Sequence, residues 1–247
     1  MPRNVLVTGA SRGIGRAVAV RLGRDGWRPL VHYRTNREMA GEAAEQAGGV
    51  AAPFGADLSN PDDCGRLWDW AASQGPVHGL VNNAGVYRPL DFTRSTDEEF
   101  DENWRSHYET NFGGTLRLTR RFARAAIEGG LEGARILNVC SRVGFRGEAG
   151  AAAYAASKAA QINLVRSLAM EMAAAGVSVF GIAPGWVDTA MARPGMEERR
   201  DEIVAGIPLG RVATPDDCAA VAAFLFSDEA AYLSGQVIDV NGASYFH

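Results

Sequence analysis

Short apolar runs alternate with longer stretches of helical periodicity along the chain, and this alternation predicts the fold. Runs rich in Val, Ile and Leu predict strands at residues 4–9, 28–33, 49–55, 77–83, 134–141, 176–184 and 235–241. Helices are predicted between them, at residues 13–25, 36–47, 61–73, 97–127, 152–174 and 215–226. Strands that alternate with helices indicate βαβ units, and continuous apolar strands are typical of a parallel sheet buried on both faces. We therefore expect an α/β protein with a doubly wound parallel sheet of about seven strands and helices on both faces.

Boundary signals support this division. Two predicted helices begin alike, with "NPDDC" at residues 60–64 and "TPDDC" at residues 214–218. Each offers a capping residue, a proline at the first helical position and two acids near the positive helix end. No low-complexity linker divides the chain, so we expect one domain over residues 1–247. The least patterned segment, residues 188–210, follows a strand end, where open α/β sheets bind ligands, and is predicted to form a lid.

The composition excludes several classes of protein. The chain has 247 residues, 47% of them hydrophobic, which is enough for a substantial core. Its net charge of −4 is the opposite of the positive charge that nucleic-acid-binding proteins carry. The first residues lack the apolar segment of a signal peptide, and the longest apolar run, residues 218–226, is too short to span a bilayer. The charge and the short apolar runs therefore predict no nucleic-acid partner and no membrane partner. Because the cysteines are few and show no paired spacing, we expect a cytoplasmic protein with no metal site.

A glycine-rich turn follows the first predicted strand. The stretch "TGASRGIG", residues 8–15, leads directly into a helix. Gly9, Gly13 and Gly15 would let the backbone approach a pyrophosphate, and the helix N-terminus would present free N–H groups to it. Glycines also serve ordinary turns, but this position after an N-terminal strand predicts a dinucleotide site.

The end of the second predicted strand indicates which dinucleotide would bind. A site for NAD usually has an acid there to hold the ribose 2′-hydroxyl, whereas this chain has Tyr33 followed by Arg34, with Arg12 inside the glycine turn. Guanidinium groups suit a 2′-phosphate, so the pattern favours NADP(H). The alternative is that both arginines are solvated surface charges.

A tyrosine and a lysine interrupt an alanine-rich helix. In "AAAYAASKAA", Tyr154 and Lys158 are four residues apart and project from one helix face. A nearby ammonium stabilises a phenolate and lowers its pKa, which would make the tyrosine an acid/base group. Taken alone, the pair also fits a packed tyrosine and a surface lysine.

The order of these motifs resembles that of the short-chain dehydrogenase/reductase family, over essentially the whole chain. Its nearest type is the 3-oxoacyl-carrier-protein reductases and their ketoreductase relatives, which have a Rossmann-type fold. The motifs are "TGASRGIG" at 8–15, "NNAG" at 82–85, Asn111, Ser141, "YAASK" at 154–158 and "PGWVDT" at 184–189.

The resemblance implies roles at the matching positions. Asn111, Ser141, Tyr154 and Lys158 would form a catalytic tetrad. Ser141 would donate a hydrogen bond to the substrate oxygen, and Asn111 would hold a water that links Lys158 to solvent. The implied cofactor-binding residues are Gly9, Ser11, Arg12, Gly13, Ile14, Gly15, Tyr33, Arg34, Asp57, Leu58, Asn83, Ala84, Gly85, Tyr154, Lys158, Pro184, Gly185, Val187 and Thr189.

We therefore expect an NADPH-dependent enzyme that reduces a ketone or 3-oxoacyl group to a secondary alcohol, with Tyr154 as acid/base. Two alternatives stay open: an NAD-dependent alcohol or sugar dehydrogenase that works oxidatively, and a non-catalytic dinucleotide-sensing regulator. The resemblance also implies a homo-oligomer, a tetramer or dimer, built through the helices at 97–127 and 152–174.

The substrate is less constrained. The two surface arginines that dock the carrier in relatives correspond here to Glu132 and Ala175, which argues against that docking mode, although Arg135 or the basic cluster at 117–124 could substitute. We expect residues 143–147, Trp186 and the lid to wall a partly apolar pocket.

Two further residues near the expected site are given structural roles. His107, one turn before Asn111, is interpreted as a helix-packing residue, and Cys140 as a small buried one.

Overall fold

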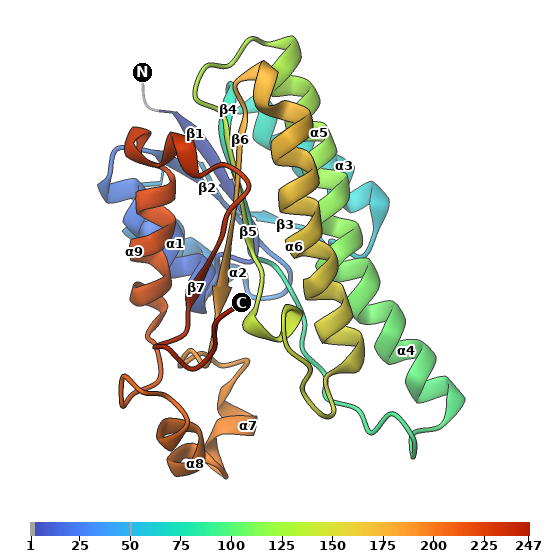
Figure 1. Ribbon diagram of the computed structural model, residues 1–247. Helices are drawn as coiled ribbons and strands as arrows, with labels where there is room; N and C mark the ends of the chain where they lie inside the picture. Colours follow the sequence, from blue (N-terminus) through green and yellow to red (C-terminus); the bar gives the residue numbers. More distant parts are fainter. Residues whose placement is uncertain (1–2, 50) are drawn as a thin grey trace.

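Seven strands form one parallel sheet in a computed structural model that describes residues 3–49 and 51–247 (Figure 1). Their order across the sheet is β3-β2-β1-β4-β5-β6-β7, so the chain winds outward from β1 in one direction and then returns to build the other half. This confirms the predicted doubly wound α/β fold. The strands are β1 (Asn4–Val7), β2 (Arg28–Tyr33), β3 (Phe54–Gly55), β4 (Val77–Asn82), β5 (Arg135–Val139), β6 (Ser178–Pro184) and β7 (Val237–Val240).

Strand β3 is much shorter than the predicted strand at 49–55. Only Phe54 and Gly55 lie in it, and they pair with His32 and Tyr33 of β2. Pro53 cannot donate a backbone hydrogen bond, and the two alanines before it have low strand propensity, so the ladder begins late. Val50, also inside the predicted strand, lies outside the described residues.

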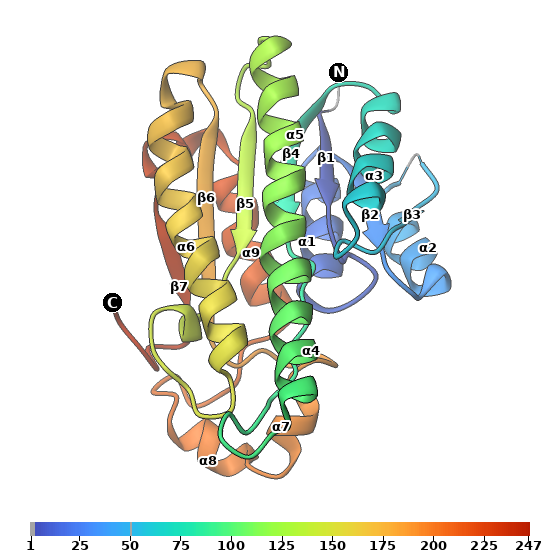
Figure 2. The ribbon, with the colours of Figure 1, turned by 90° about the vertical axis from the view of Figure 1, so that its right-hand side faces the viewer.

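Helices cover both faces of the sheet (Figures 1 and 2). One face packs against α1 (Gly13–Arg24), α2 (Arg37–Gln46) and α9 (Pro215–Leu225). The other packs against α3 (Pro61–Ser73), α5 (Gly114–Glu128) and α6 (Ala152–Met172), with α4 (Asp97–His107) extending the helix layer beyond the sheet. Each face buries its own apolar core, as expected for a parallel sheet between two helix layers.

The two repeated helix starts cap their helices as predicted. The Asn60 side chain accepts a hydrogen bond from Asp62 N at 2.8 Å, and Thr214 forms a reciprocal capping box with Asp217. Both helices carry a proline in the first turn. These ends are therefore fixed by local chemistry that is visible in the sequence.

The predicted helix at 97–127 is interrupted. Between α4 and α5 the backbone widens into a π-helical turn, η1 (Tyr108–Gly113), which contains Asn111. Such turns insert an extra residue into a helix and occur frequently at functional sites. Here the interruption turns the Asn111 side chain onto the loop after β4, where Val86 N donates to Oδ1 at 2.7 Å and Nδ2 donates to Val86 O at 3.0 Å.

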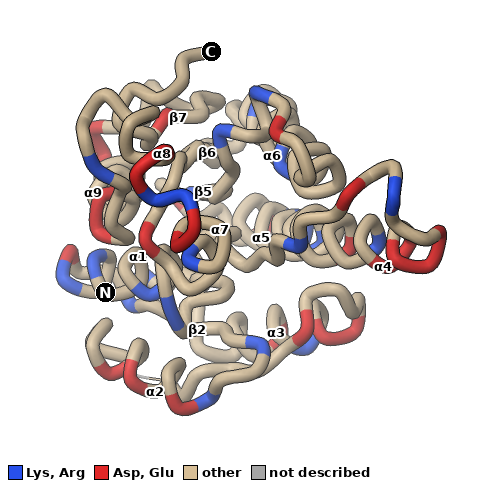
Figure 3. Tube along the Cα trace, turned by 90° about the horizontal axis from the view of Figure 1, so that it is seen from below, with Lys and Arg blue, Asp and Glu red and all other residues tan. Residues whose placement is uncertain are grey.

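The segment predicted as a lid has internal structure. It holds α7 (Arg193–Glu197) and α8 (Arg200–Ala205) beyond the carboxyl ends of the strands (Figure 1). Met196, Ile203, Ile207 and Val212 form a small apolar cluster, against which Trp186 packs. Seen from this end, acidic and basic residues lie side by side on α8 (Figure 3). Among the described residues, no helix is long and apolar enough to cross a membrane.

Candidate active site

The carboxyl ends of β1, β4, β5 and β6 bring most of the predicted site residues to one edge of the sheet. The glycine turn follows β1, Asn83 follows β4, Ser141 follows β5, and Gly185 follows β6. These ends lie together because all the strands run in the same direction, and each connection returns through a helix on one face of the sheet. Tyr154 and Lys158 reach the same edge from α6.

The glycine turn requires glycine at three positions. Gly9 and Gly13 have φ of +63° and +57°, the left-handed region that other residues rarely adopt. A Cβ on Gly15 would lie 2.4 Å from Nδ2 of Asn83 and 2.5 Å from the Gly9 carbonyl oxygen. That close approach exists because Asn83 Nδ2 donates to the carbonyls of Thr8 and Gly9, at 2.8 and 3.0 Å. Asn83 therefore fixes the glycine turn to the end of β4.

The N-terminus of α1 is suited to an anion. Helices α3, α4 and α9 each have a capping side chain and acids in their first turn. In the described part of the chain, α1 has neither: its capping residue, Arg12, makes no side-chain hydrogen bond. Its first N–H groups and the positive end of its dipole are left for a ligand. A Cβ on Gly13 would lie 3.3 Å from Cγ2 of Thr189, so the loop after β6 closes over this turn.

His32 holds the glycine turn from the second strand, and the sequence analysis did not identify it. Gly9 N donates to Nδ1 of His32 at 3.0 Å, and Nε2 donates to the Ala56 carbonyl at 3.1 Å. This pairing requires the neutral tautomer with its proton on Nε2. Burial lowers the pKa of His32 to about 4, which favours that neutral form. No sequence signal marked this role, because it joins segments far apart along the chain.

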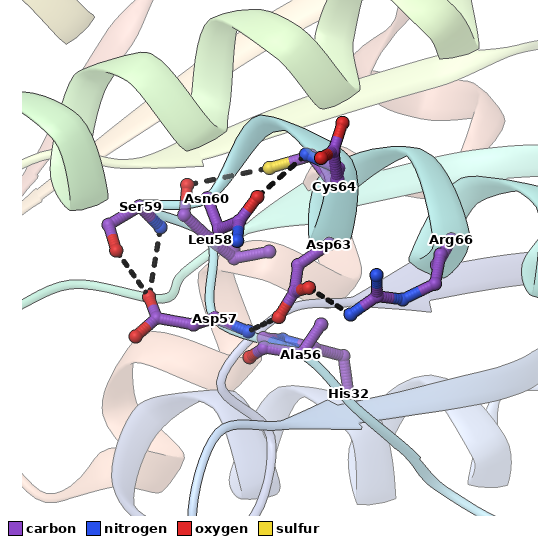
Figure 4. Close-up of polar contacts among 10 residues, drawn as sticks. His32, Ala56, Asp57, Leu58, Ser59, Asn60, Asp63, Cys64 and Arg66 are labelled. Atoms are coloured by element: carbon purple, nitrogen blue, oxygen red, sulfur yellow. Dashed lines mark hydrogen bonds and ion pairs between the residues drawn. The ribbon is translucent and has the colours of Figure 1, made fainter.

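The residues expected around the adenosine ribose lie together at the ends of β2 and β3. Tyr33, Arg34 and Asp57 line an open depression of about 630 Å³, with Thr35, Gly55, Ala56 and Asp63. Asp57 is braced by its neighbours (Figure 4): Ser59 donates to Oδ1 through its N–H and its hydroxyl, at 3.0 and 2.7 Å. Partial burial raises the pKa of Asp57, but these hydrogen bonds and the charge of Arg34 outweigh it and hold the pKa below the usual value.

A second carboxylate, that of Asp63, holds the loop after β3 in place beside the depression. Asp57 N donates to Oδ2 of Asp63 at 2.8 Å, and Asp63 also pairs with Arg66 (Figure 4). Leu58, the other predicted residue of this loop, is buried under α5, where a Cβ on Gly114 would lie 2.8 Å from it. The loop after β3 is therefore a rigid wall of the depression.

Tyr154 lies beside Ser141, with its phenol end among protein atoms. Burial raises the pKa of Tyr154 to about 12, and a hydrogen bond with Ser141 only partly opposes the rise. The predicted lowering of this pKa by Lys158 is therefore wrong for this arrangement. The Lys158 ammonium lies 5.7 Å from the tyrosine ring centroid and is bonded elsewhere. Tyr154 is accordingly a neutral phenol, the form that can give up a proton.

Lys158 is buried and held on two sides. Its Nζ donates to the Val139 carbonyl at 2.8 Å and to Oε1 of Gln161 at 2.9 Å. Gln161 in turn donates to the Asn111 carbonyl at 2.6 Å. The Gln161 amide thus links the Asn111 carbonyl to Lys158, and the water expected between Asn111 and Lys158 stays a prediction. Burial lowers the pKa of Lys158 to about 8.

His107 and Cys140 behave as interpreted. Both ring nitrogens of His107 have protein partners: Nδ1 donates to Asn103 O at 2.8 Å, and Nε2 accepts from Arg88 N at 3.1 Å. Its ring lies 5.9 Å from that of Tyr154, so it packs against the site. Burial raises the pKa of Cys140 to about 12, which keeps it a thiol.

The residues that could dock an acidic carrier differ in exposure and charge. Glu132 and Ala175 are exposed, as a docking surface would require, but offer no positive charge. Arg135 cannot replace them: it is buried in β5 and pairs with Asp228 at 2.8 Å. The expectation that Arg135 could substitute is wrong, because its guanidinium is covered and already bonded to the Phe226 carbonyl and to Asp228. In the basic cluster, Arg120, Arg121 and Arg124 are exposed on α5.

Known proteins resemble the chain over nearly its whole length. A family model described as Enoyl-(Acyl carrier protein) reductase matches residues 9–243. The acetoacetyl-CoA reductase of Allochromatium vinosum is 36% identical over 100% of both chains. The 3-oxoacyl-(acyl carrier protein) reductase of Vibrio cholerae is 36% identical over 97% of this chain and 96% of its own.

A solved structure has the same fold throughout. It is a proposed NAD(P)-dependent gluconate 5-dehydrogenase from Beutenbergia cavernae with NADP bound at low occupancy, 38% identical, with a TM-score of 0.90 over 98% of this chain and 96% of that chain. That protein's cofactor agrees with the expectation of NADP(H). From the matched residues and relatives, the chain belongs to the short-chain dehydrogenase/reductase family and is an oxidoreductase acting on CH–OH or C=O groups.

Proposed function

We propose that the protein is an NADPH-dependent reductase that converts a ketone, such as a 3-oxoacyl group, to a secondary alcohol. The observation that carries the proposal is the half-buried Tyr154, whose phenol is hydrogen-bonded with Ser141 at the strand edge that also holds the glycine turn. Reduction of a carbonyl requires a proton donor, and a tyrosine whose pKa is raised to about 12 is protonated at neutral pH.

The cofactor residues fit NADP(H). The uncapped α1 terminus and the glycine cradle suit a pyrophosphate. Arg34 is exposed where it lines the open depression. The position at the end of β2 that carries an acid in NAD sites is Tyr33 here, so no carboxylate is available to bind a ribose 2′-hydroxyl. A 2′-phosphate is therefore the better partner for Arg34. Arg12, exposed at the start of α1, adds a second positive charge. The remaining residues of the predicted set, Pro184, Gly185 and Val187, line the nicotinamide side.

The chain's own groups complete the reaction. Bound NADPH supplies a hydride to the carbonyl carbon. Tyr154 gives its proton to the carbonyl oxygen as negative charge develops there, and Ser141 donates a hydrogen bond to the same oxygen. Lys158 would hold the ribose and return a proton to Tyr154, and the neutral amine left behind would regain its proton from solvent. Asn111 positions the lysine through Gln161, from the π-helical turn.

A second candidate is oxidation of an alcohol, such as a sugar acid, by the same residues in reverse. The description of the solved neighbour as a gluconate dehydrogenase supports it. The regulator alternative is disfavoured because all four tetrad positions are filled and brought together. The cytoplasmic location stays a prediction; Cys64, Cys140 and Cys218 are buried thiols.

We also propose that the chain, as one domain over residues 1–247, assembles with copies of itself. Five apolar residues recur at every fourth position along α4, η1 and α5 and form an apolar stripe: Phe100, Trp104, Tyr108, Phe112 and Leu116. Four of them are exposed, and three of their aromatic rings pack in a row, with centroid distances of 4.7 Å between Trp104 and Tyr108 and 5.8 Å between Tyr108 and Phe112. A stripe of this kind suits another helical surface of its own type.

One experiment tests the function. The rate of NADPH oxidation is measured with a panel of β-keto esters, 3-oxoacyl thioesters, sugars and quinones, and each active substrate is repeated with NADH. The proposal expects turnover with at least one ketone and a higher kcat/KM with NADPH. Turnover only with sugar alcohols and NAD would support the second candidate instead.

A further inference from the structure

One polar side chain beside the tetrad, Gln161, touches neither the substrate oxygen nor the cofactor in the proposed reaction. Gln161 lies three residues after Lys158 on α6 and is fully buried. The residues that follow on this face, Ile162 and Val165, are apolar and belong to the core. A buried amide costs free energy unless its donors and acceptor are all satisfied, so its presence here needs a reason.

The hydrogen bonds of Gln161 are complete, and they fix its orientation. Nε2 donates to the Asn111 carbonyl at 2.6 Å and to Oγ1 of Thr115 at 3.0 Å. Oε1 accepts from Lys158 Nζ at 2.9 Å. Because an ammonium only donates and a carbonyl only accepts, the amide cannot be turned over without breaking both contacts.

We propose that Gln161 is a positioning residue for the catalytic lysine, fixing Lys158 Nζ between the Val139 carbonyl and the π-helical turn that contains Asn111. Two of the three N–H groups of the ammonium are directed into the protein in this way. The third is left to serve the ribose and Tyr154. This inference rests on the proposed function, because it assigns Gln161 a part in that reaction.

The Asn111 carbonyl at the far end of this chain of hydrogen bonds is also held by protein donors. The Asn111 carbonyl accepts from Gln161 and from Thr115 Oγ1, at 2.6 and 2.8 Å, so both lone pairs are used by side chains. The charge state of Lys158 therefore depends on Gln161, together with the titratable groups that face the lysine, which are Tyr154, Cys140 and His107.

The chain offers an unusually direct test, because Lys158 is its only lysine. Full-length protein made with isotopically labelled lysine gives one lysine side-chain NMR signal, and its pH titration reports Lys158 alone. Gln161→Met keeps the length of the side chain and removes the acceptor, whereas Gln161→Glu keeps an acceptor and adds charge. Asn163→Ala removes an exposed amide from the same helix and is the matched control.

The two Gln161 variants should shift the midpoint of the Lys158 titration in opposite directions. In Gln161→Met the charged form loses a hydrogen bond, so the midpoint falls by roughly one pH unit. In Gln161→Glu a carboxylate faces the ammonium, so the midpoint rises by roughly one unit or more. Asn163→Ala leaves it unchanged. The pH profile of kcat for ketone reduction shifts in the same direction as each midpoint.

A midpoint that stays at the wild-type value in both Gln161 variants would overturn the proposal. If Gln161→Met does not fold, the nearly isosteric Gln161→Glu decides alone, since a folded variant with an unshifted midpoint overturns it equally. Failure of the reductase proposal is separate: it appears as absence of ketone turnover in the wild-type protein, and the NMR titration still decides the role of Gln161.

Discussion

Gly9 donates its backbone N–H to Nδ1 of His32 over 3.0 Å, so β2 holds the turn that follows β1. The contact depends on a neutral imidazole, since a protonated Nδ1 cannot accept. Folding lowers the pKa of His32 from 6.5 to about 4. Between these values the unfolded chain binds more protons than the folded one. The stability that neutral His32 contributes is therefore present above pH 6.5 and is lost as the pH falls toward 4.

We expect acid sensitivity to diminish in His32→Gln, whose amide can accept from Gly9 without titrating. The shift corresponds to about 3 kcal/mol across this window. Urea unfolding of both proteins at neutral pH and at about pH 4 gives the two free-energy differences. The wild-type protein should lose more stability than the variant; equal losses would contradict the role of His32.

The contact between Gly15 and Asn83 predicts a steric effect. In Gly15→Ala the new methyl group would lie 2.4 Å from Asn83 Nδ2 and 2.5 Å from the Gly9 carbonyl oxygen, both of which are held in place. We expect a loss of about 1–3 kcal/mol in stability and weaker NADP binding. Gly41→Ala is the control: in α2, among the described residues, its Cβ meets no atom within 4 Å. That variant should be as stable as the wild type or slightly more so.

Arg34 should determine cofactor preference. Replacing it with alanine removes a charge-assisted contact to a 2′-phosphate but nothing that NADH uses. Because the residue is exposed, we expect a roughly ten-fold rise in KM for NADPH, with the KM for NADH almost unchanged. Arg37→Ala, an exposed arginine on α2, controls for the change in net charge. Equal weakening of both cofactors would show that Arg34 does not recognise the phosphate.

The apolar stripe predicts the effect of a surface charge on assembly. Trp104 is the most exposed residue of the stripe, at 44%, and Trp104→Glu would place a carboxylate where another copy packs. We expect the mass measured by light scattering to fall to that of a smaller species. Leu209→Glu, on the lid, should keep the wild-type mass. A monomeric wild-type protein would disprove the proposed assembly.

Local signals predicted most of the fold. The caps at Asn60 and Thr214 act within one turn, and the strand runs are buried on both faces, so each could be identified from neighbouring residues. The π-helical turn at Asn111 could not, because helical periodicity does not distinguish a turn widened by one residue. The small core of the lid was missed for a related reason: α7 and α8 are too short to establish a period.

Some residues of the candidate site could likewise be predicted from the sequence, and others could not. Motif order brought Ser141, Tyr154 and Lys158 to attention, and the structure places them at one strand edge. The roles of His32 and Gln161 depend on partners from distant segments, such as Gly9 and Asn111. The pKa of Tyr154 was mispredicted because sequence spacing shows that Lys158 is near but not that burial outweighs it.

The central claim is that Tyr154 donates the proton in ketone reduction, and Tyr154→Phe tests it most directly. The substitution removes one hydroxyl and keeps the ring that packs against Tyr87. NADPH binding is followed by fluorescence and ketone reduction by NADPH absorbance, with Tyr87→Phe as a control that removes a neighbouring phenol. We predict NADPH binding within about three-fold of wild type and a fall in kcat of at least about a hundred-fold, for Tyr154→Phe alone. A Tyr154→Phe enzyme that reduces the ketone at the wild-type rate would contradict the account.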